Sequence, residues 1–182
     1  MGLEPFFTIG HSTRGVDETA SLLIGVGASM VVDVRAVPRS RTNPQFNMDV
    51  LPDDLAARGI GYRHIAALGG LRSRRKDAGP SPNTFWENAS FRNYADYAET
   101  APFRDGLAEL IGLGAPDVCA IMCAEAVWWR CHRRIIADYL IAGGSPVFHI
   151  MGPGKTTPAT LTPSAREGGA GQLIYSGTGR VP

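Results

Sequence analysis

The feature that most constrains the fold is the alternation of short apolar runs with segments of helical character. Five runs have the composition of buried strands, at 5–10, 30–34, 60–65, 118–122 and 146–151. Segments with helical periodicity separate them, at 17–27, 49–59, 90–100, 102–114 and 129–144. Strands that alternate with helices form βαβ units, in which the strands are parallel and helices cover both faces. The sequence therefore predicts an α/β fold, a three-layer αβα sandwich with a mainly parallel sheet of about five strands.

Length and composition favour one domain, assigned to residues 1–176, followed by a tail at 177–182. No apolar run reaches the length of about 18 residues that a membrane span needs. The first residues lack the basic region and cleavage site of a secretory signal. Three cysteines, an odd number, argue against a disulfide framework. We therefore expect a cytoplasmic protein that makes no membrane contact, and the oligomeric state stays open.

Reactive side chains gather where the predicted strands end. They are polar or ionisable, and each closes or follows one strand: His11, Ser12, Thr13 and Arg14; Asp33, Arg35, Arg39, Ser40 and Arg41; His64; Cys123 and Glu125; and His149. The carboxyl ends of parallel strands point to one edge of a sheet, and open α/β sheets bind ligands there. The sequence therefore predicts a functional site at that edge.

Two groups of these residues suit an anionic substrate. The loop of Ser12, Thr13 and Arg14 enters a helix whose free N–H groups and dipole favour an anion, although Ser12 or Thr13 could instead cap the helix. Arg35, Arg39, Ser40 and Arg41 suit phosphate or carboxylate binding, with a solvated loop as the alternative. Asp33 lies inside an apolar run and needs a partner, for which Arg35 and Arg14 are the candidates.

The stretch "VCAIMCAEAVWWRCHRR" (118–134) concentrates the reactive groups. Cys123 follows a strand and precedes a helix, which predicts a lowered thiol pKa and a nucleophilic role. Glu125 is a candidate general base, a partner for His132, or an acid that suits the helix dipole. The alternative for Cys123 is a buried apolar role, which we assign to Cys119.

The position at which the next helix begins decides the roles of Cys131, His132 and Arg133. A helix that begins at Ala126 places Cys131 and His132 on its apolar face, within the core. A helix that begins near Trp129 or Arg130 places all three in its first turn, where they can face Cys123. The residues themselves leave both options open.

A metal site is a further alternative, because Cys123, Glu125, Cys131 and His132 are all competent zinc or iron ligands. Their spacing matches no common zinc finger or ribbon, and no second pair of ligands is present. We therefore expect no cofactor and no metal ligands.

Several long motifs resemble one known family. They are TIGHSTR, DVRAVPRSRTNPQFN, LGG (68–70), FRNYADYAET, CAEAVWWRCHRRIIADYL and VFHI. In the same order, they resemble the bacterial family named domain of unknown function 488, over nearly the whole chain up to about Tyr175. The resemblance implies an α/β domain of this size and no established reaction. Family members often carry a proline between Cys-x-Glu and Cys-His-Arg, which favours the late helix start; here "AVWW" contains none.

Two functions from different classes follow. The first is an enzyme that acts on an anionic substrate, such as a nucleotide or nucleic-acid component, with Asp33, His11, Cys123, Glu125 or His132 in the chemistry. The second is a nucleic-acid-binding protein without chemistry, such as a repair accessory. It would use the basic residues Arg72, Arg74, Arg75 and Lys76 and the aromatic residues Phe85, Trp86 and Trp129, if these are exposed.

Overall fold

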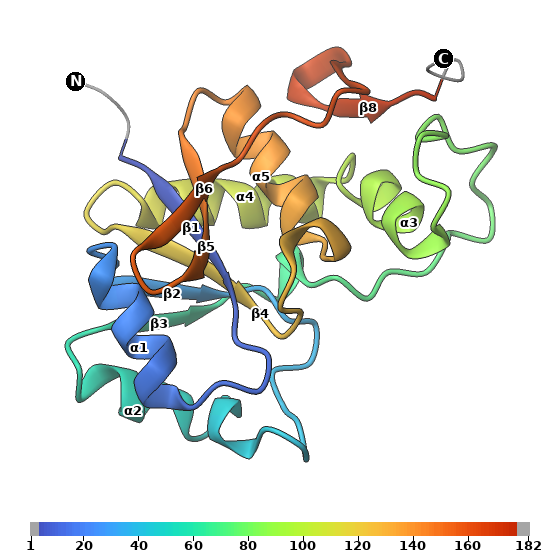
Figure 1. Cartoon of the computed structure of the whole chain (residues 1–182). Coiled ribbons are helices and arrows are strands. Elements are labelled where there is room, and N and C mark those ends of the chain that lie inside the picture. The colour runs from blue at the N-terminus through green and yellow to red at the C-terminus, as the bar shows by residue number, and fades with distance from the viewer. Residues whose placement is uncertain (1–3, 178–182) are drawn as a thin grey trace.

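The computed structural model describes residues 4–177 and contains a central six-stranded sheet (Figure 1). Its strands are β1 (Phe6–Gly10), β2 (Met30–Asp33), β3 (Gly61–His64), β4 (Cys119–Cys123), β5 (Val147–Gly152) and β6 (Lys155–Pro158). They lie in the order β3-β2-β4-β1-β5-β6, and only the edge strand β6 is antiparallel to its neighbour. The predicted α/β class and the mainly parallel sheet are confirmed.

Helices cover both faces of the sheet. The first face is covered by α1 (Val16–Gly25) and α2 (Leu51–Ala56), and the second by α3 (Ala89–Tyr97), α4 (Ala101–Leu113) and α5 (Arg133–Ala142). Each face has its own apolar core, because alternate strand residues point to opposite sides. Val31 belongs to the core under α1 and α2, and Val32 to the core under α5. Within residues 4–177, every helix is too short or too polar to span a lipid bilayer.

The strands of the last thirty residues are mostly not predictable from the sequence. Strand β6 pairs with β5 as a polar, fully exposed edge, so it carries no apolar alternation. A separate hairpin is formed by β7 (Ala165–Glu167) and β8 (Leu173–Tyr175), and only the second of these has an apolar run. Tyr175 is fully buried and joins the core under α5, so the C-terminal segment is part of the domain. Residues 178–182 of the expected tail lie outside the described part.

Strands β1 and β4 are neighbours whose following helices cover opposite faces. Gly10, the last residue of β1, is in register with Cys123, the last residue of β4. The chain then continues to α1 on one face and to α5 on the other, so the two loops separate above the sheet. In open α/β sheets such a reversal of strand order opens the crevice in which ligands bind. The topology thus places the loops after β1 and β4 at the ligand-binding position of this fold class.

Candidate functional site

A pocket of about 330 Å³ opens at the carboxyl edge of β2 and β4. Five residues that the sequence singled out line it: Arg35, Cys123, Glu125, Cys131 and His132. Their neighbours in the wall are mostly apolar and include Val37, Leu71, Phe91 and Tyr94. The volume is at the lower end of the range that small-molecule sites occupy. The pocket therefore combines apolar walls with two thiols and an imidazole.

Helix α5 begins at Arg133, after a 3₁₀ turn at Trp128–Arg130. Of the two options that the sequence left open, the structure therefore has the late start. Cys131 and His132 lie in the turn just before the helix rather than on its apolar face. Because the backbone N–H groups of a first helical turn have no partner in the helix, they can donate to an anion placed there. The Arg133 N–H does so, with its nitrogen 3.5 Å from the sulfur of Cys131.

The two thiols of the pocket lie against each other, with 2.7 Å between the Sγ atoms of Cys123 and Cys131. The hydrogen bond to Cys131, burial and the charge of Cys131 together raise the pKa of Cys123 well above 9.0. Burial alone would raise the pKa of Cys131 as well. Hydrogen bonds from Cys123 and His132 and the charges of His132 and Arg133 outweigh it, and the pKa of Cys131 lies well below 9.0. These two pKa directions favour Cys131 as the thiolate and Cys123 as the thiol that donates to it, whereas the sequence pattern pointed to Cys123 as the nucleophile.

The imidazole of His132 has a defined tautomer. Its Nε2 atom lies 2.8 Å from the carbonyl oxygen of Val34, which can only accept, so Nε2 carries a proton. Its Nδ1 atom lies 3.5 Å from the sulfur of Cys131. Movement of one proton from sulfur to Nδ1 converts a thiol and an imidazole into a thiolate and an imidazolium. This is the arrangement by which a neighbouring base activates a cysteine nucleophile.

Arg133 is the largest fully buried side chain of the described residues. Its guanidinium donates from Nε to the sulfur of Cys131 at 3.3 Å, and from Nη2 to the backbone oxygen of Glu125 at 2.6 Å. Within residues 4–177 it forms no ion pair with a carboxylate. A buried charge without a counter-ion is costly, and the Cys131 sulfur in contact with the guanidinium is a group that can ionise to supply the opposite charge.

Two glycines make room for the site. A Cβ atom added at Gly70 would lie 2.5 Å from Nδ1 of His132, and one added at Gly10 would collide with the backbone oxygen of Glu125. Because Gly70 has no side chain, the His132 ring can pack directly against its backbone beside the pocket. Gly10 lets the loop after β4 cross directly over the end of β1. Gly70 belongs to the LGG motif of the family resemblance, but the sequence did not indicate a role for it at the site.

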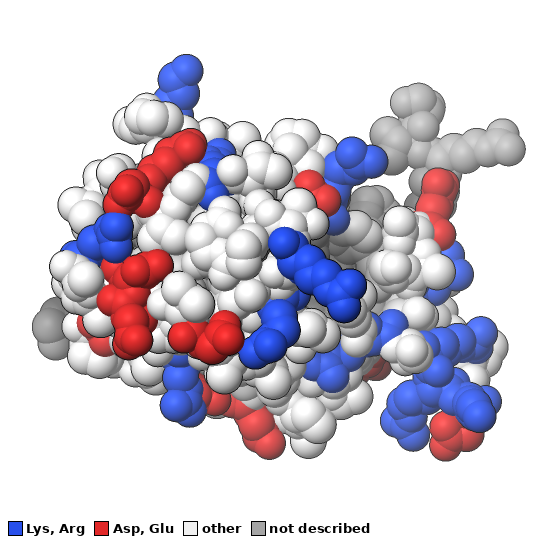
Figure 2. Space-filling model, turned by 90° about the horizontal axis from the view of Figure 1, so that it is seen from below, with Lys and Arg blue, Asp and Glu red and all other residues white. Residues whose placement is uncertain are grey.

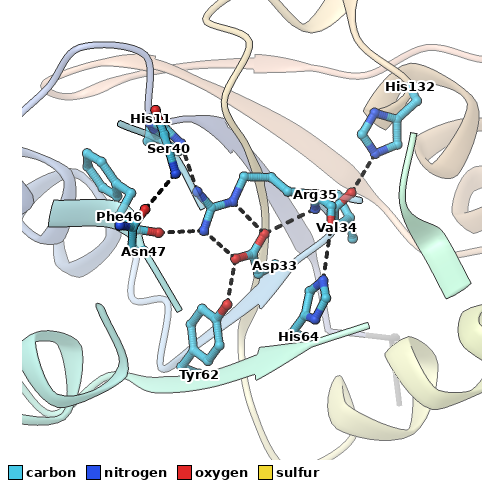
Figure 3. A network of polar contacts seen from close by, with 10 residues as sticks. All are labelled: His11, Asp33, Val34, Arg35, Ser40, Phe46, Asn47, Tyr62, His64 and His132. Atoms are coloured by element: carbon cyan, nitrogen blue, oxygen red, sulfur yellow. Dashed lines mark hydrogen bonds and ion pairs between the residues drawn. The ribbon is translucent and has the colours of Figure 1, made fainter. Parts of the chain in front are cut away.

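Asp33 and Arg35 form a buried ion pair beside the pocket (Figure 3). The guanidinium donates to both carboxylate oxygens, at 2.9 and 2.6 Å, and Tyr62 adds a hydrogen bond of 2.6 Å to Oδ2. Asp33 is fully buried and does not line the pocket, so its carboxylate is not available to a substrate. The predicted pairing with Arg35 is confirmed, and Asp33 acts on the site only by holding Arg35.

His11 lies behind Arg35, away from the pocket. Its Nδ1 donates to the backbone oxygen of Ser12 at 2.8 Å, and its ring stacks on Phe46 with 4.0 Å between the centroids. Its Nε2 is therefore an acceptor, 3.4 Å from Nη1 of Arg35 (Figure 3). Burial lowers the pKa of His11 to about 4, so the ring is neutral near pH 7. His11 supports Arg35 rather than touching a ligand.

His149 lies within β5 rather than at its end, in register with Thr8 of β1. Its Nδ1 is 2.7 Å from the Thr8 hydroxyl, which also accepts a long hydrogen bond of 3.4 Å from Arg133. Its ring stacks on Trp128 at 4.3 Å, and burial lowers its pKa to about 4. The histidine thus fixes the Thr8 hydroxyl under the Arg133 guanidinium. The sequence indicated nothing of the role of Thr8.

The remaining predicted anion-binding residues do not line the pocket: Ser12, Thr13, Arg14, Arg39, Ser40 and Arg41. Arg14 folds back on its own chain, with a hydrogen bond to the Gly10 carbonyl at 2.5 Å and an ion pair with Glu18 at 3.2 Å. The Ser40 hydroxyl accepts from two backbone N–H groups of its own loop. Helix α1 has no side-chain cap, so Ser12 and Thr13 do not cap it either. Side chains at one sheet edge need not share one cavity.

Arg130 also lines the pocket, although the sequence pattern did not single it out within the quoted stretch. It is exposed and forms no ion pair with any described residue, so it can bind an anion at the pocket mouth.

The metal-site alternative finds no support among the described residues. Within residues 4–177, no group of three or more His, Cys, Asp and Glu side chains is arranged to hold an ion.

The surface charge of the molecule is uneven. Figure 2 shows most Lys and Arg side chains of one face on one half, and most Asp and Glu side chains on the other. Arg74, Arg75 and Lys76 are exposed in the loop that follows the pocket residue Leu71. Of the aromatic residues expected on the surface, Phe85 and Trp129 are exposed, but Trp86 is buried and stacks on Phe91. The expected stacking role of Trp86 is therefore wrong.

Comparison with known proteins places the chain in one family. The family model described as "Domain of unknown function DUF488" matches residues 15–140, which include β2, β3, β4 and nearly all of α5. The match contains every residue that lines the pocket. No match to the chain was found among curated proteins or among solved structures.

Proposed function

The chain belongs to the DUF488 family, and we propose that it is an enzyme in which the Cys131 thiolate attacks an anionic substrate. The substrate class that fits the site is a nucleotide or a nucleic-acid component. Cys123 and Arg133 stabilise the thiolate, and His132 exchanges protons with it. Arg130 binds the negative charge of the substrate at the mouth of the pocket.

The observation that carries the proposal is the pairing of the buried Arg133 guanidinium with the sulfur of Cys131. A guanidinium stays charged in proteins at any ordinary pH, so it favours the thiolate over the thiol. The adjacent N–H of the first helical turn acts in the same direction. Cys131 thus has the electropositive surroundings that are typical of reactive cysteines, and it lines a pocket that a substrate can enter.

The chemistry follows from the position of the proton. The thiolate attacks an electrophilic atom of the substrate, and a new bond from sulfur forms as the bond to the leaving group breaks. The His132 imidazolium supplies its Nδ1 proton to the leaving group. Neutral His132 then accepts a proton from the water that hydrolyses the sulfur adduct, and the thiolate is restored. The Val34 carbonyl keeps the ring in place through Nε2 during both transfers.

The walls of the pocket support the choice of substrate. Phe91, Leu71 and Val37 form an apolar surface on which a planar base can pack. The guanidinium of Arg130 can form two charge-assisted hydrogen bonds with a phosphate. Leu71 also lines a second cavity together with Arg72, Arg74 and Arg75, so further positive charge lies next to the pocket. The site therefore combines one apolar and one anion-binding part, as a nucleotide requires.

A protection experiment tests the proposal through the reactivity of the cysteines themselves. The reduced protein is treated with iodoacetamide over a series of pH values, and the label at each cysteine is measured by peptide mass spectrometry. We expect Cys131 to react first, with a midpoint well below pH 9.0, and Cys119 to react last, because burial raises its pKa to about 12. Nucleoside monophosphates or short oligonucleotides should slow the labelling of Cys131, while sodium chloride at the same ionic strength should not.

The proposal fails if Cys131 reacts no faster than Cys119, or if no member of the nucleotide panel protects it. Cys131→Ser is the companion variant, and it should remove the early label while the protein keeps its fold. Circular dichroism and thermal unfolding of that variant report the fold independently of reactivity.

A second function, nucleic-acid binding without chemistry, is favoured by the exposed basic residues Arg74, Arg75 and Lys76. Binding through phosphate contacts weakens steeply as salt rises. The variant in which all three are replaced by Gln should then lose affinity for an oligonucleotide and show a flatter salt dependence. Unchanged affinity in that variant excludes this loop as a nucleic-acid contact.

A further inference from the structure

Cys123 and Cys131 come from different elements, the end of β4 and the turn before α5, yet their sulfurs lie 2.7 Å apart. A disulfide bond is about 2.05 Å long, so a side-chain movement of less than about 1 Å separates the two states. Both cysteines line the wall of the open pocket, where a small oxidant can reach them. The two sulfurs are therefore close enough to form and break a bond through a small movement.

We propose that Cys123 and Cys131 are a reversible redox pair whose disulfide switches the site off. The switching role depends on the proposed function, because it requires Cys131 to be the nucleophile. The formation of the disulfide depends only on the geometry of the two cysteines. The chemical class of the oxidant is a peroxide, and that of the reductant is a dithiol.

The two thiols have the unequal roles that such a pair needs. Cys131 is the more anionic sulfur and attacks the peroxide, because the thiolate is the reactive form. Cys123 retains its proton and lies in contact with the product, so it acts as the resolving cysteine. Cys119, on the same strand as Cys123, forms no side-chain hydrogen bond with any described residue and is fully buried. It provides an internal control.

The reaction balances with one peroxide. The Cys131 sulfur attacks one peroxide oxygen, the O–O bond breaks, and Cys131 becomes a sulfenic acid as the first water leaves. The Cys123 sulfur then attacks the sulfenic sulfur, the S–O bond breaks, and the second water leaves with the Cys123 proton. Two thiols lose two electrons and two protons in total, and hydrogen peroxide becomes two waters. A dithiol reverses the step by thiol–disulfide exchange and is itself oxidised to a disulfide.

Arg133 makes this disulfide easy to reduce. In the reduced protein its guanidinium is paired with the Cys131 thiolate. In the oxidised protein neither sulfur carries a charge, and the same guanidinium is buried without a counter-ion. Stabilisation of the reduced form makes a disulfide more oxidising, which is the property of labile, regulatory bonds rather than structural ones.

The experiment uses the full chain, reduced and then treated with one equivalent of hydrogen peroxide. We expect an intact mass lower by two hydrogen atoms and a single cross-linked peptide that joins Cys123 to Cys131. Iodoacetamide labelling of Cys131 should be lost, and a dithiol should restore it fully. Cys119→Ala should behave as the wild type does.

Cys123→Ser is the decisive variant, because a serine hydroxyl still donates to the thiolate but cannot form a disulfide. In this variant we expect one equivalent of peroxide to leave Cys131 as a sulfenic acid, one oxygen heavier. Three equivalents, given to the variant and to the wild type alike, should add two or three oxygen atoms to Cys131 of the variant, and a dithiol should not reverse that gain. The inference is overturned if the wild type also accumulates such over-oxidised Cys131, if no cysteine is oxidised, or if the cross-link contains Cys119. The proposed function is tested separately by nucleotide protection of the reduced protein. A cross-link without protection would remove the switching role and leave the redox pair standing.

Discussion

The Nδ1 atom of His132 lies 3.5 Å from the sulfur of Cys131, the residue directly before it in the chain. Adjacent side chains in a regular helix diverge, so a Cys–His pair of consecutive residues requires a turn. The turn is present because α5 begins only at Arg133. The hydrogen bond from Nε2 to the Val34 carbonyl then directs Nδ1 to the sulfur.

Replacement of this imidazole should therefore reduce the reactivity of Cys131. In His132→Gln we expect iodoacetamide to label Cys131 at least about tenfold more slowly near pH 7, because the group that accepts the thiol proton is lost. The matched control is His64→Gln. His64 also lies with its Nε2 at 2.8 Å from a carbonyl, that of Arg35 (Figure 3). Unlike His132, it forms no hydrogen bond with the Cys131 sulfur among the described residues. Equal losses in both variants would contradict the role of Nδ1.

The space that Gly70 leaves for the His132 ring should also be needed for the reactivity of Cys131. Gly70→Ala places a Cβ atom 2.5 Å from Nδ1 of His132, so the ring must move away from Cys131. We expect slower labelling of Cys131 and only moderate destabilisation. Gly79→Ala is the control, because a Cβ atom there meets no other atom within 4 Å. If Cys131 of Gly70→Ala is labelled as fast as in the wild type, the position of the His132 ring does not control the reactivity of Cys131.

The buried ion pair should dominate the stability of this edge of the sheet. Asp33→Asn leaves the Arg35 charge buried without its partner, and we expect a loss of about 3–5 kcal/mol in the free energy of unfolding. Asp49→Asn breaks the exposed pair with Arg39 and should cost only about 0–1 kcal/mol. Urea unfolding of the two variants measures the difference. Similar midpoints would mean that Arg35 finds another partner.

The two buried histidines should make the protein sensitive to acid. Burial lowers the pKa of His11 and of His149 from 6.5 to about 4. Between these values the unfolded chain binds protons that the folded chain does not, so stability is full above pH 6.5 and falls as the pH drops towards 4. We expect a loss of roughly 3 kcal/mol in the free energy of unfolding per histidine over this pH range. His149→Gln, which can still accept the Thr8 hydrogen bond, should flatten this part of the profile, and an unchanged slope would refute the assignment.

The sequence was sufficient for the parallel sheet and its boundaries. The run predicted at 30–34 became β2 at Met30–Asp33, and the run at 118–122 became β4 at Cys119–Cys123. Both are buried on two faces, so nearly every residue is apolar and the signal is strong. The edge strand β6 was missed, since its exposed residues leave no apolar pattern to read.

The sequence also placed reactive residues at the carboxyl edge, but the tertiary structure selected among them. Asp33 and Cys123 both close a strand, yet Asp33 points to the α1 and α2 face, and Cys123 to the α5 face where the pocket lies. Our proposal that Cys131 rather than Cys123 is the thiolate required the positions of His132 and Arg133 in space. Local composition determines strands and helices, because burial of apolar side chains follows a short period along the chain. The charge of a thiol depends on the few groups within hydrogen-bond reach, and only folding brings those together.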